Sequence, residues 1–167
     1  MHDFPANIGT SRHENDIIAI LARLQRIGLP DNPIALYGSS SFRIWSSVAE
    51  DLGSLDIVNL GFGGGTYLSA SHYLHQVLVP LKPAKVLLYF GENDIASDGL
   101  KAETTLRHLQ DLRDRISQAL PRADVVVLAI KQSPARWIYR HEFDLFNQEA
   151  RDWCNSCEHT TWFDPNV

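Results

Sequence analysis

The chain has 167 residues, of which 44% are hydrophobic, so it is long enough for one globular domain with a substantial core. Its formal net charge of -5 and its pI near 5.7 argue against a nucleic-acid-binding protein, which usually presents a basic face. The start of the chain carries no targeting pattern, and no apolar run approaches membrane-spanning length, so we expect a cytoplasmic protein without a membrane span.

The first predicted element is an amphipathic helix that begins near Ser11 and ends before Gly28 and Pro30. Its apolar residues recur at three- and four-residue spacing, which places them on one face. These residues are Ile17, Ile20, Leu21, Leu24 and Ile27.

Five short apolar runs follow along the chain and are typical of buried strands. They span residues 34–37, 56–63, 85–91, 124–130 and 160–164. Amphipathic helices separate the last three runs, with apolar stripes made of Leu106, Leu109, Leu112, Ile116 and Leu120, and of Phe143, Phe146, Ala150 and Trp153. Strands that alternate with helices indicate a parallel sheet covered on both faces. We predict a single domain over residues 1–167, an α/β/α three-layer sandwich with a flavodoxin-like five-stranded parallel sheet in the order 2-1-3-4-5.

Polar and glycine-rich turns follow the first four predicted strands, where an open parallel sheet places its ligands. They span residues 38–41, 59–66, 91–94 and 131–134. A serine between a strand and a helix, such as Ser40, projects its hydroxyl above the sheet, and its N–H lies where the helix favours an oxyanion. Glycines at the second turn let a backbone N–H approach the same point, and the Asn93 amide supplies a further donor.

Each turn also has a simpler interpretation when it is taken alone. Ser40 is equally well explained as a helix cap, and Asn93 as a residue that stabilises a turn. The stretch "GFGGGT" resembles a phosphate loop only weakly, because it lacks the Lys-Ser/Thr ending and has Thr66 where the dinucleotide motif requires glycine. The occurrence of all three turns at successive strand ends favours an acyl-transfer site.

In this order the turns resemble the conserved blocks of the SGNH hydrolases, the GDSL-type esterase and lipase superfamily. The segments that carry the resemblance are "YGSSSFRIW" (37–45), "NLGFGGGT" (59–66) and "YFGENDIA" (89–96). Together with "KQSPARW" (131–137), they are similar to a bacterial subgroup with a Gly-Ser-Ser-Ser-x-Arg-x-Trp first block. The resemblance implies that Ser40 is the nucleophile and an oxyanion N–H donor, that Gly64 gives a second N–H, and that Asn93 gives a side-chain donor.

The family's remaining block, Asp-x-x-His, supplies the general base and the carboxylate that orients it, and it is absent from these 167 residues. Asp164 resembles the end of the fifth strand, and position 167 holds Val rather than His. None of the seven histidines (His2, His13, His72, His75, His108, His141 and His159) lies in a motif that argues for a replacement. We therefore expect a chain that lacks the catalytic loop and final helix, with an exposed apolar sheet face that favours a homodimer.

We expect no cofactor and no metal ion in this protein. Cys154 and Cys157 form a Cys-x-x-Cys pair at the end of a helical pattern, where the helix dipole opposes thiolate formation. We interpret Cys154 as a core residue and Cys157 as incidental.

The function indicated by the resemblance is a serine esterase that hydrolyses small acyl or acetyl esters. One alternative is a catalytically impaired scaffold of the same fold that acts as a binding or interaction module. Another is a flavodoxin-like protein that binds phosphate or a nucleotide at the glycine turn.

Overall fold

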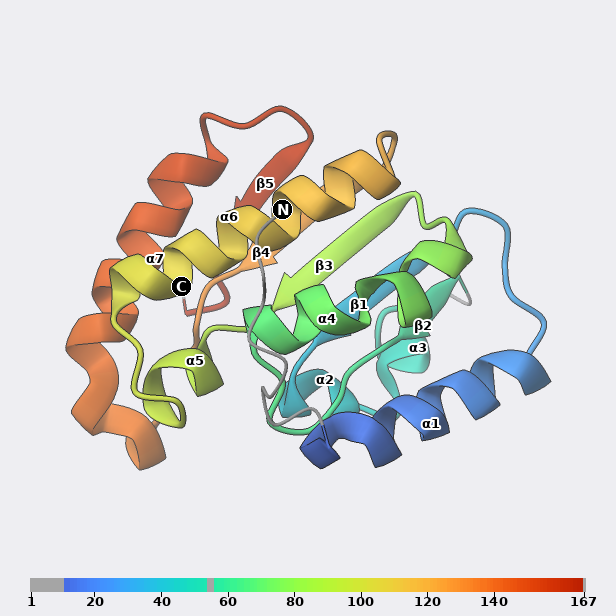
Figure 1. Cartoon of the computed structure of the whole chain (residues 1–167), viewed down its shortest axis with the longest axis horizontal. Coiled ribbons are helices and arrows are strands. Elements are labelled where there is room, and N and C mark those ends of the chain that lie inside the picture. Colours follow the sequence, from blue (N-terminus) through green and yellow to red (C-terminus); the bar gives the residue numbers. More distant parts are fainter. Residues whose placement is uncertain (1–10, 54–55, 167) are drawn as a thin grey trace.

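The computed structural model describes residues 11–53 and 56–166, in which five parallel strands form one sheet between layers of helices (Figure 1). The strands are β1 (Ile34–Gly38), β2 (Ile57–Asn59), β3 (Lys85–Tyr89), β4 (Asp124–Leu128) and β5 (Thr160–Phe163). The longer helices are α1 (Ser11–Arg26), α4 (Tyr67–Val77), α6 (Ala102–Ala119) and α7 (Arg140–Cys154). The shorter ones are α2 (Ser40–Arg43), α3 (Val48–Asp51), η1 (Val79–Leu81), α5 (Glu92–Ala96) and η2 (Pro134–Tyr139).

The strands lie in the order β2-β1-β3-β4-β5, which confirms the predicted sheet. Side chains alternate between the two faces of a strand, so β1, β2, β3 and β4 each contribute to two separate apolar clusters. Ala35 and Tyr37 of β1 belong to the large cluster, whereas Leu36 between them belongs to the small one. The two clusters lie on opposite faces of the sheet, so helices pack on both sides and give the predicted three layers.

Helices α4, α6 and α7 supply the large cluster and cover one face of the sheet (Figure 1). The predicted apolar face of α1 joins the same cluster, with Ile17 and Ile20 fully buried. Short helices α2 and α3 cover the other face through Phe42 and Val48, which pack with Leu36 of β1. The predicted helices therefore all form, and most of their apolar stripes are buried or partly buried. Ile27, predicted in the stripe of the first helix, lies after α1 ends at Arg26 and is 44% exposed.

The second apolar run, residues 56–63, is a strand only as far as Asn59, where the predicted turn of residues 59–66 begins. Beyond that point the chain turns under α2, and it approaches the backbone of that helix closely. A Cβ on Gly61 would lie 2.3 Å from the N atom of Arg43, so only glycine allows this approach. The apolar appearance of the run comes from Leu60 and Phe62, which are buried in the core after the strand has ended.

The second face of the sheet is less completely covered beside β4 and β5. Leu87 and Leu128 are only partly buried there, and Phe163 at the end of β5 is 55% exposed. The homodimer that we expect from the sequence stays a prediction, which sedimentation would test. None of the described helices is both long and apolar enough to span a membrane.

Candidate active site

The first strand ends in a serine turn in which the three serines have different surroundings. Ser39 is the buried residue before α2, and its N–H donates to the carbonyl of Tyr89 at 3.0 Å. Ser40 begins the helix and is partly exposed. Ser41 accepts a hydrogen bond from Nζ of Lys131 at 2.8 Å. Ser40 therefore combines access to solvent with a place at the start of a helix, as the predicted nucleophile requires.

The glycine turn lies directly against the serine turn. The N–H of Phe62 donates to the carbonyl of Gly38 at 3.0 Å, which extends the pairing of β1 and β2 beyond the strands. Asn59 fixes the same junction, because its Nδ2 donates to the carbonyl of Phe42 at 2.7 Å and its Oδ1 accepts from the N–H of Gly61 at 2.9 Å. Gly64 has a φ of 66°, a left-handed conformation that favours glycine.

The side chain of Asn93 connects the third strand end to the glycine turn. Its Nδ2 donates to the carbonyl of Gly65 at 3.0 Å, and only 7% of the residue is exposed. An amide nitrogen carries two hydrogens, so this bond leaves one hydrogen of Nδ2 for a further acceptor. The turns that carry Ser40, Gly64 and Asn93 are thus joined by hydrogen bonds at one edge of the sheet.

Arg136, from the segment after β4, contacts Glu92 and Asn93, the first two residues of α5. Its guanidinium donates to Oδ1 of Asn93 at 3.2 Å and to the carbonyl of Glu92 at 3.0 Å. It also pairs with the Glu92 carboxylate, at 3.3 Å from Nε to Oε1. Because Glu92 is 9% exposed, this cation balances a carboxylate that is largely removed from water.

A polar chain links Arg136 back to the serine turn through the buried phenol of Tyr89. Tyr89 donates to the Glu92 carboxylate at 3.4 Å, and Lys131 lies over the Tyr89 ring at 5.9 Å while it contacts Ser41. Burial, followed by the neighbouring Glu92 charge, raises the pKa of Tyr89. The phenol therefore stays protonated at neutral pH and acts as a donor.

Asp94 is a fully buried carboxyl that holds two neighbouring turns together. It accepts hydrogen bonds from the N–H of Tyr67 at 3.1 Å and from the N–H of Gly91 at 3.0 Å. Burial raises the pKa of Asp94 to about 7, although both backbone donors act in the opposite direction. Asp94 thus joins the first residue of α4 to the turn before Asn93.

Sequence patterns did not assign the contacts made by Arg136, Asn59 and Asp94. The segment "KQSPARW" was part of the resemblance, but nothing in its spacing indicates that Arg136 reaches Asn93. Of the histidines, His72 and His75 are exposed on α4, as expected for surface residues. None of the described histidines donates to or accepts from Ser40 in the hydrogen bonds of residues 11–53 and 56–166.

The cysteine pair has the predicted surroundings. Cys154 is completely buried, and burial raises its pKa to about 12, whereas Cys157 is half-buried. Within the described part of the chain, no group of three His, Cys, Asp or Glu side chains is arranged to hold a metal ion.

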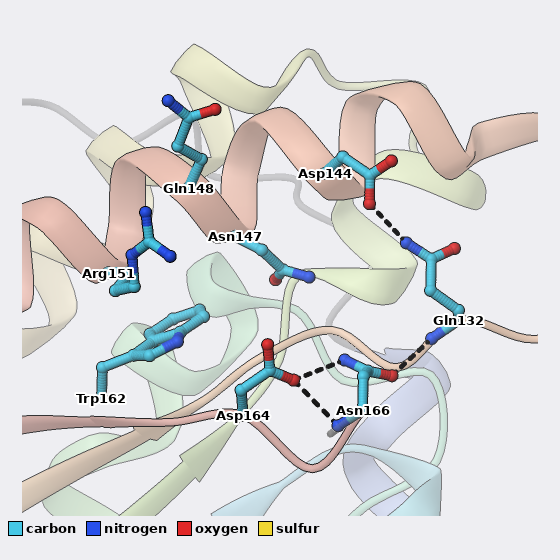
Figure 2. A pocket seen from close by; sticks show the side chains of 8 residues that line it. All are labelled: Gln132, Asp144, Asn147, Gln148, Arg151, Trp162, Asp164 and Asn166. Carbon is cyan, nitrogen blue, oxygen red and sulfur yellow. Dashed lines mark hydrogen bonds between the residues drawn. The ribbon is translucent and has the colours of Figure 1, made fainter.

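A polar pocket of about 270 Å³ lies between α7 and the segments that follow β4 and β5. Figure 2 shows Asp164 bonded to Asn166, which in turn accepts from the N–H of Gln132 at 3.0 Å. Nε2 of Gln132 donates to Asp144 of α7 at 2.6 Å. These contacts fix the end of β5, where Asp164 was expected, and they do not involve Ser40, Gly64 or Asn93.

The five-stranded parallel sheet, in the order β2-β1-β3-β4-β5, is the α/β sheet of the SGNH fold. The chain belongs to the GDSL-like Lipase/Acylhydrolase family, whose sequence profile matches residues 28–166. This match confirms the superfamily inferred from the motifs. A search of curated proteins gave no match.

Solved structures share this fold at low sequence identity. A Streptococcus pneumonia protein, described as a candidate platelet activating factor, has a TM-score of 0.79 at 19% identity, over 93% of this chain and 76% of its own. A GDSL-like lipase from Bacteroides thetaiotaomicron has a TM-score of 0.71 at 13% identity, over 93% and 77%. A carbohydrate esterase family 3 protein from Talaromyces cellulolyticus has a TM-score of 0.64 at 16% identity, over 79% and 77%.

Proposed function

We propose that the protein is a serine esterase of small acyl or acetyl esters, with Ser40 as its nucleophile. The observation that carries this proposal is a pair of contacts at the sheet edge. Phe62 joins the glycine turn to the serine turn, and Asn93 joins the third turn to the glycine turn. A nucleophile and oxyanion donors on three adjacent turns are what acyl transfer needs.

In the proposed reaction Oγ of Ser40 attacks the ester carbonyl carbon, and the carbonyl oxygen becomes an oxyanion. The N–H groups of Ser40 and Gly64 and the Asn93 amide hold this oxyanion. Collapse breaks the bond to the alcohol, which leaves with a proton, and water then hydrolyses the acyl-serine to a carboxylic acid. The group that accepts the Ser40 proton is unassigned, because the chain carries no Asp-x-x-His block.

The family and its ester-hydrolysing neighbours support an ester substrate, and an aryl acetate is the simplest one to test. The acidic net charge and the GDSL-like family support a small-molecule substrate rather than nucleic acid. A cytoplasmic location remains part of the proposal.

The test compares the wild-type chain with Ser40→Ala and with the adjacent Ser41→Ala on an aryl acetate. We expect Ser40→Ala to lower turnover on the order of a hundredfold or more, because the covalent route is lost. Ser41→Ala should keep most of the activity, since Ser41 contacts Lys131 instead. A fluorophosphonate, which forms a P–O bond to an activated serine and releases fluoride, should label the wild type at Ser40.

The two alternatives predict different results in the same assay. An impaired scaffold would show equal turnover in the wild type and Ser40→Ala, with no labelling by the fluorophosphonate. A phosphate or nucleotide binder would instead show a raised melting temperature with inorganic phosphate or a nucleotide.

A further inference from the structure

His13 is a buried histidine of α1 that contacts the glycine turn. It is 2% exposed, and its Nδ1 lies 2.9 Å from the carbonyl oxygen of Gly63. A carbonyl oxygen only accepts, so Nδ1 carries the proton in this bond. The ring packs edge-on against Phe62 and Tyr73, with centroids at 5.2 Å and 6.5 Å. His13 therefore has a fixed place beside the turn.

The bonded oxygen belongs to the peptide group that also carries the N–H of Gly64. The described chain contains no cis peptide bond, and in a planar trans peptide the carbonyl and the N–H point in opposite directions. A hydrogen bond that holds the Gly63 carbonyl therefore also sets the direction of the Gly64 N–H. That N–H is one of the oxyanion donors in the proposed reaction.

The other side of Gly63 is held from the same helix. Oδ2 of Asp16 accepts from the N–H of Gly63 at 2.7 Å, and Oδ1 of Asp16 lies 3.5 Å from the Arg43 guanidinium at the end of α2. His13 and Asp16 are three residues apart, which places them on one face of the helix. One turn of α1 thus holds both peptide groups of Gly63.

These restraints matter because the glycine run has little conformational preference of its own. Three consecutive glycines, Gly63 to Gly65, lack the side-chain sterics that restrict other residues, and Gly64 occupies the left-handed region. Rotation of the Gly63–Gly64 peptide would change the direction of the Gly64 N–H. A hydrogen bond to the carbonyl also polarises the peptide and strengthens its N–H as a donor.

We propose that His13 is a positioning residue, which orients the Gly64 N–H toward the oxyanion by holding the Gly63 carbonyl. This proposal rests on the proposed function for its catalytic consequence, but not for its geometry. His13 lies outside the stretch that the family profile matches, residues 28–166, so the family comparison does not assign it this part.

The test uses two variants of the full chain, one without a hydrogen-bond donor at position 13 and one with a donor there. His13→Phe removes the hydrogen bond and keeps an aromatic ring among Phe62 and Tyr73. His13→Asn loses the ring but offers an amide N–H about where Nδ1 lies. Ile20→Val is the packing control, since Ile20 is a buried residue of the same helix that does not contact the turn through a polar group.

Two readouts are measured for each variant. The first is the amide ¹H–¹⁵N resonance of Gly64, which reports the peptide whether or not an ester is turned over. The second is the rate of fluorophosphonate labelling of Ser40, together with kcat and KM on the aryl acetate. We expect His13→Phe to shift the Gly64 resonance and to lower kcat and the labelling rate about tenfold, with KM nearly unchanged.

His13→Asn should recover the wild-type resonance and most of the rate, and Ile20→Val should change neither readout. An unchanged Gly64 resonance in His13→Phe, or equal losses in the Phe and Asn variants, would overturn the proposal in favour of a packing residue. If the wild type neither turns over the ester nor becomes labelled, the proposed function fails, and the Gly64 resonance alone decides whether His13 orients this peptide.

Discussion

Arg136 donates from Nη2 to Oδ1 of Asn93 at 3.2 Å, while Nδ2 of the same amide donates to the carbonyl of Gly65 at 3.0 Å. Both bonds require the same orientation of the amide, because a guanidinium can only donate and a carbonyl can only accept. Arg136 and the Gly65 carbonyl therefore together fix which end of the Asn93 amide faces the glycine turn. The predicted oxyanion donor depends on a residue that lies after the fourth strand.

Replacement of Arg136 by Met should lower kcat about tenfold, because the Asn93 amide loses the partner that fixes its orientation. The melting temperature should also fall, since the Glu92 carboxylate is left buried without its cation. Arg140→Met is the matched control, because Arg140 is exposed and lies over the Trp137 ring at 5.1 Å. Equal kinetic effects of the two replacements would contradict the assignment.

Replacement of Asn93 by Asp should remove the oxyanion donor and leave the Arg136 contact in place. Loss of one such donor lowers kcat by about 10²–10³-fold in a serine hydrolase. A carboxylate beside the developing oxyanion adds repulsion, so we expect a loss at the upper end of that range. Steady-state kinetics on the aryl acetate measures the loss, and Ser97→Ala, which removes only a 3.5 Å contact to Oδ1, should be nearly neutral.

Replacement of Gly64 by Ala should destabilise the protein by about 1–2 kcal/mol, because a Cβ is unfavourable at a φ of 66°. Gly99→Ala is the control for this strain, since Gly99 has a φ of 71° and open space around it. Urea denaturation should give similar losses for the two variants. Only Gly64→Ala should also lower kcat, and a similar kinetic loss in Gly99→Ala would show that strain alone is responsible.

The fold could be predicted from the sequence because its signals are local and repeated. Strand runs such as 85–91 and 124–130 alternate with strongly amphipathic helices, and this alternation permits few sheet orders. The short elements could not be predicted in the same way. Helices α2 and α5 have four and five residues, too few for a periodic pattern, and the fixed turns around them determine their form.

Only those residues of the candidate site that lie at strand ends could be predicted from the sequence. The serine turn, the glycine turn and Asn93 were found because the carboxyl ends of parallel strands meet at one edge, and the resemblance to the SGNH hydrolases then implied the roles of Ser40 and Gly64. His13 contacts Gly63, which lies 50 residues further along the chain, and Arg136 contacts Asn93, which lies 43 residues before it. No local sequence pattern indicates pairs that are so far apart. The roles of Ser40, Gly64 and Asn93 stay predictions, which the kinetics of the variants test.

The buried carboxyl of Asp94 should make the stability of the protein depend on pH. Its pKa is about 7 in the folded protein, above the ordinary value of 3.8, because burial disfavours its charged form. The folded state therefore binds more protons than the unfolded state between about pH 4 and pH 7. Stability from this group is fully present below pH 4 and is lost as the pH rises through 7, with a slope of at most about 1.4 kcal/mol per pH unit.

Replacement of Asp94 by Asn should remove this slope, because an amide does not ionise in the range. The free energy of unfolding, measured by urea denaturation from pH 4.5 to pH 8, should fall less steeply with pH in Asp94→Asn than in the wild type. Glu142 has a lowered pKa, because the N–H of Ala102 and the Lys101 side chain donate to its carboxylate. Its contribution to the free energy of unfolding therefore changes at lower pH than that of Asp94, and it rises with pH instead of falling. Identical slopes in the two proteins would show that Asp94 stays ionised through its bonds to Tyr67 and Gly91.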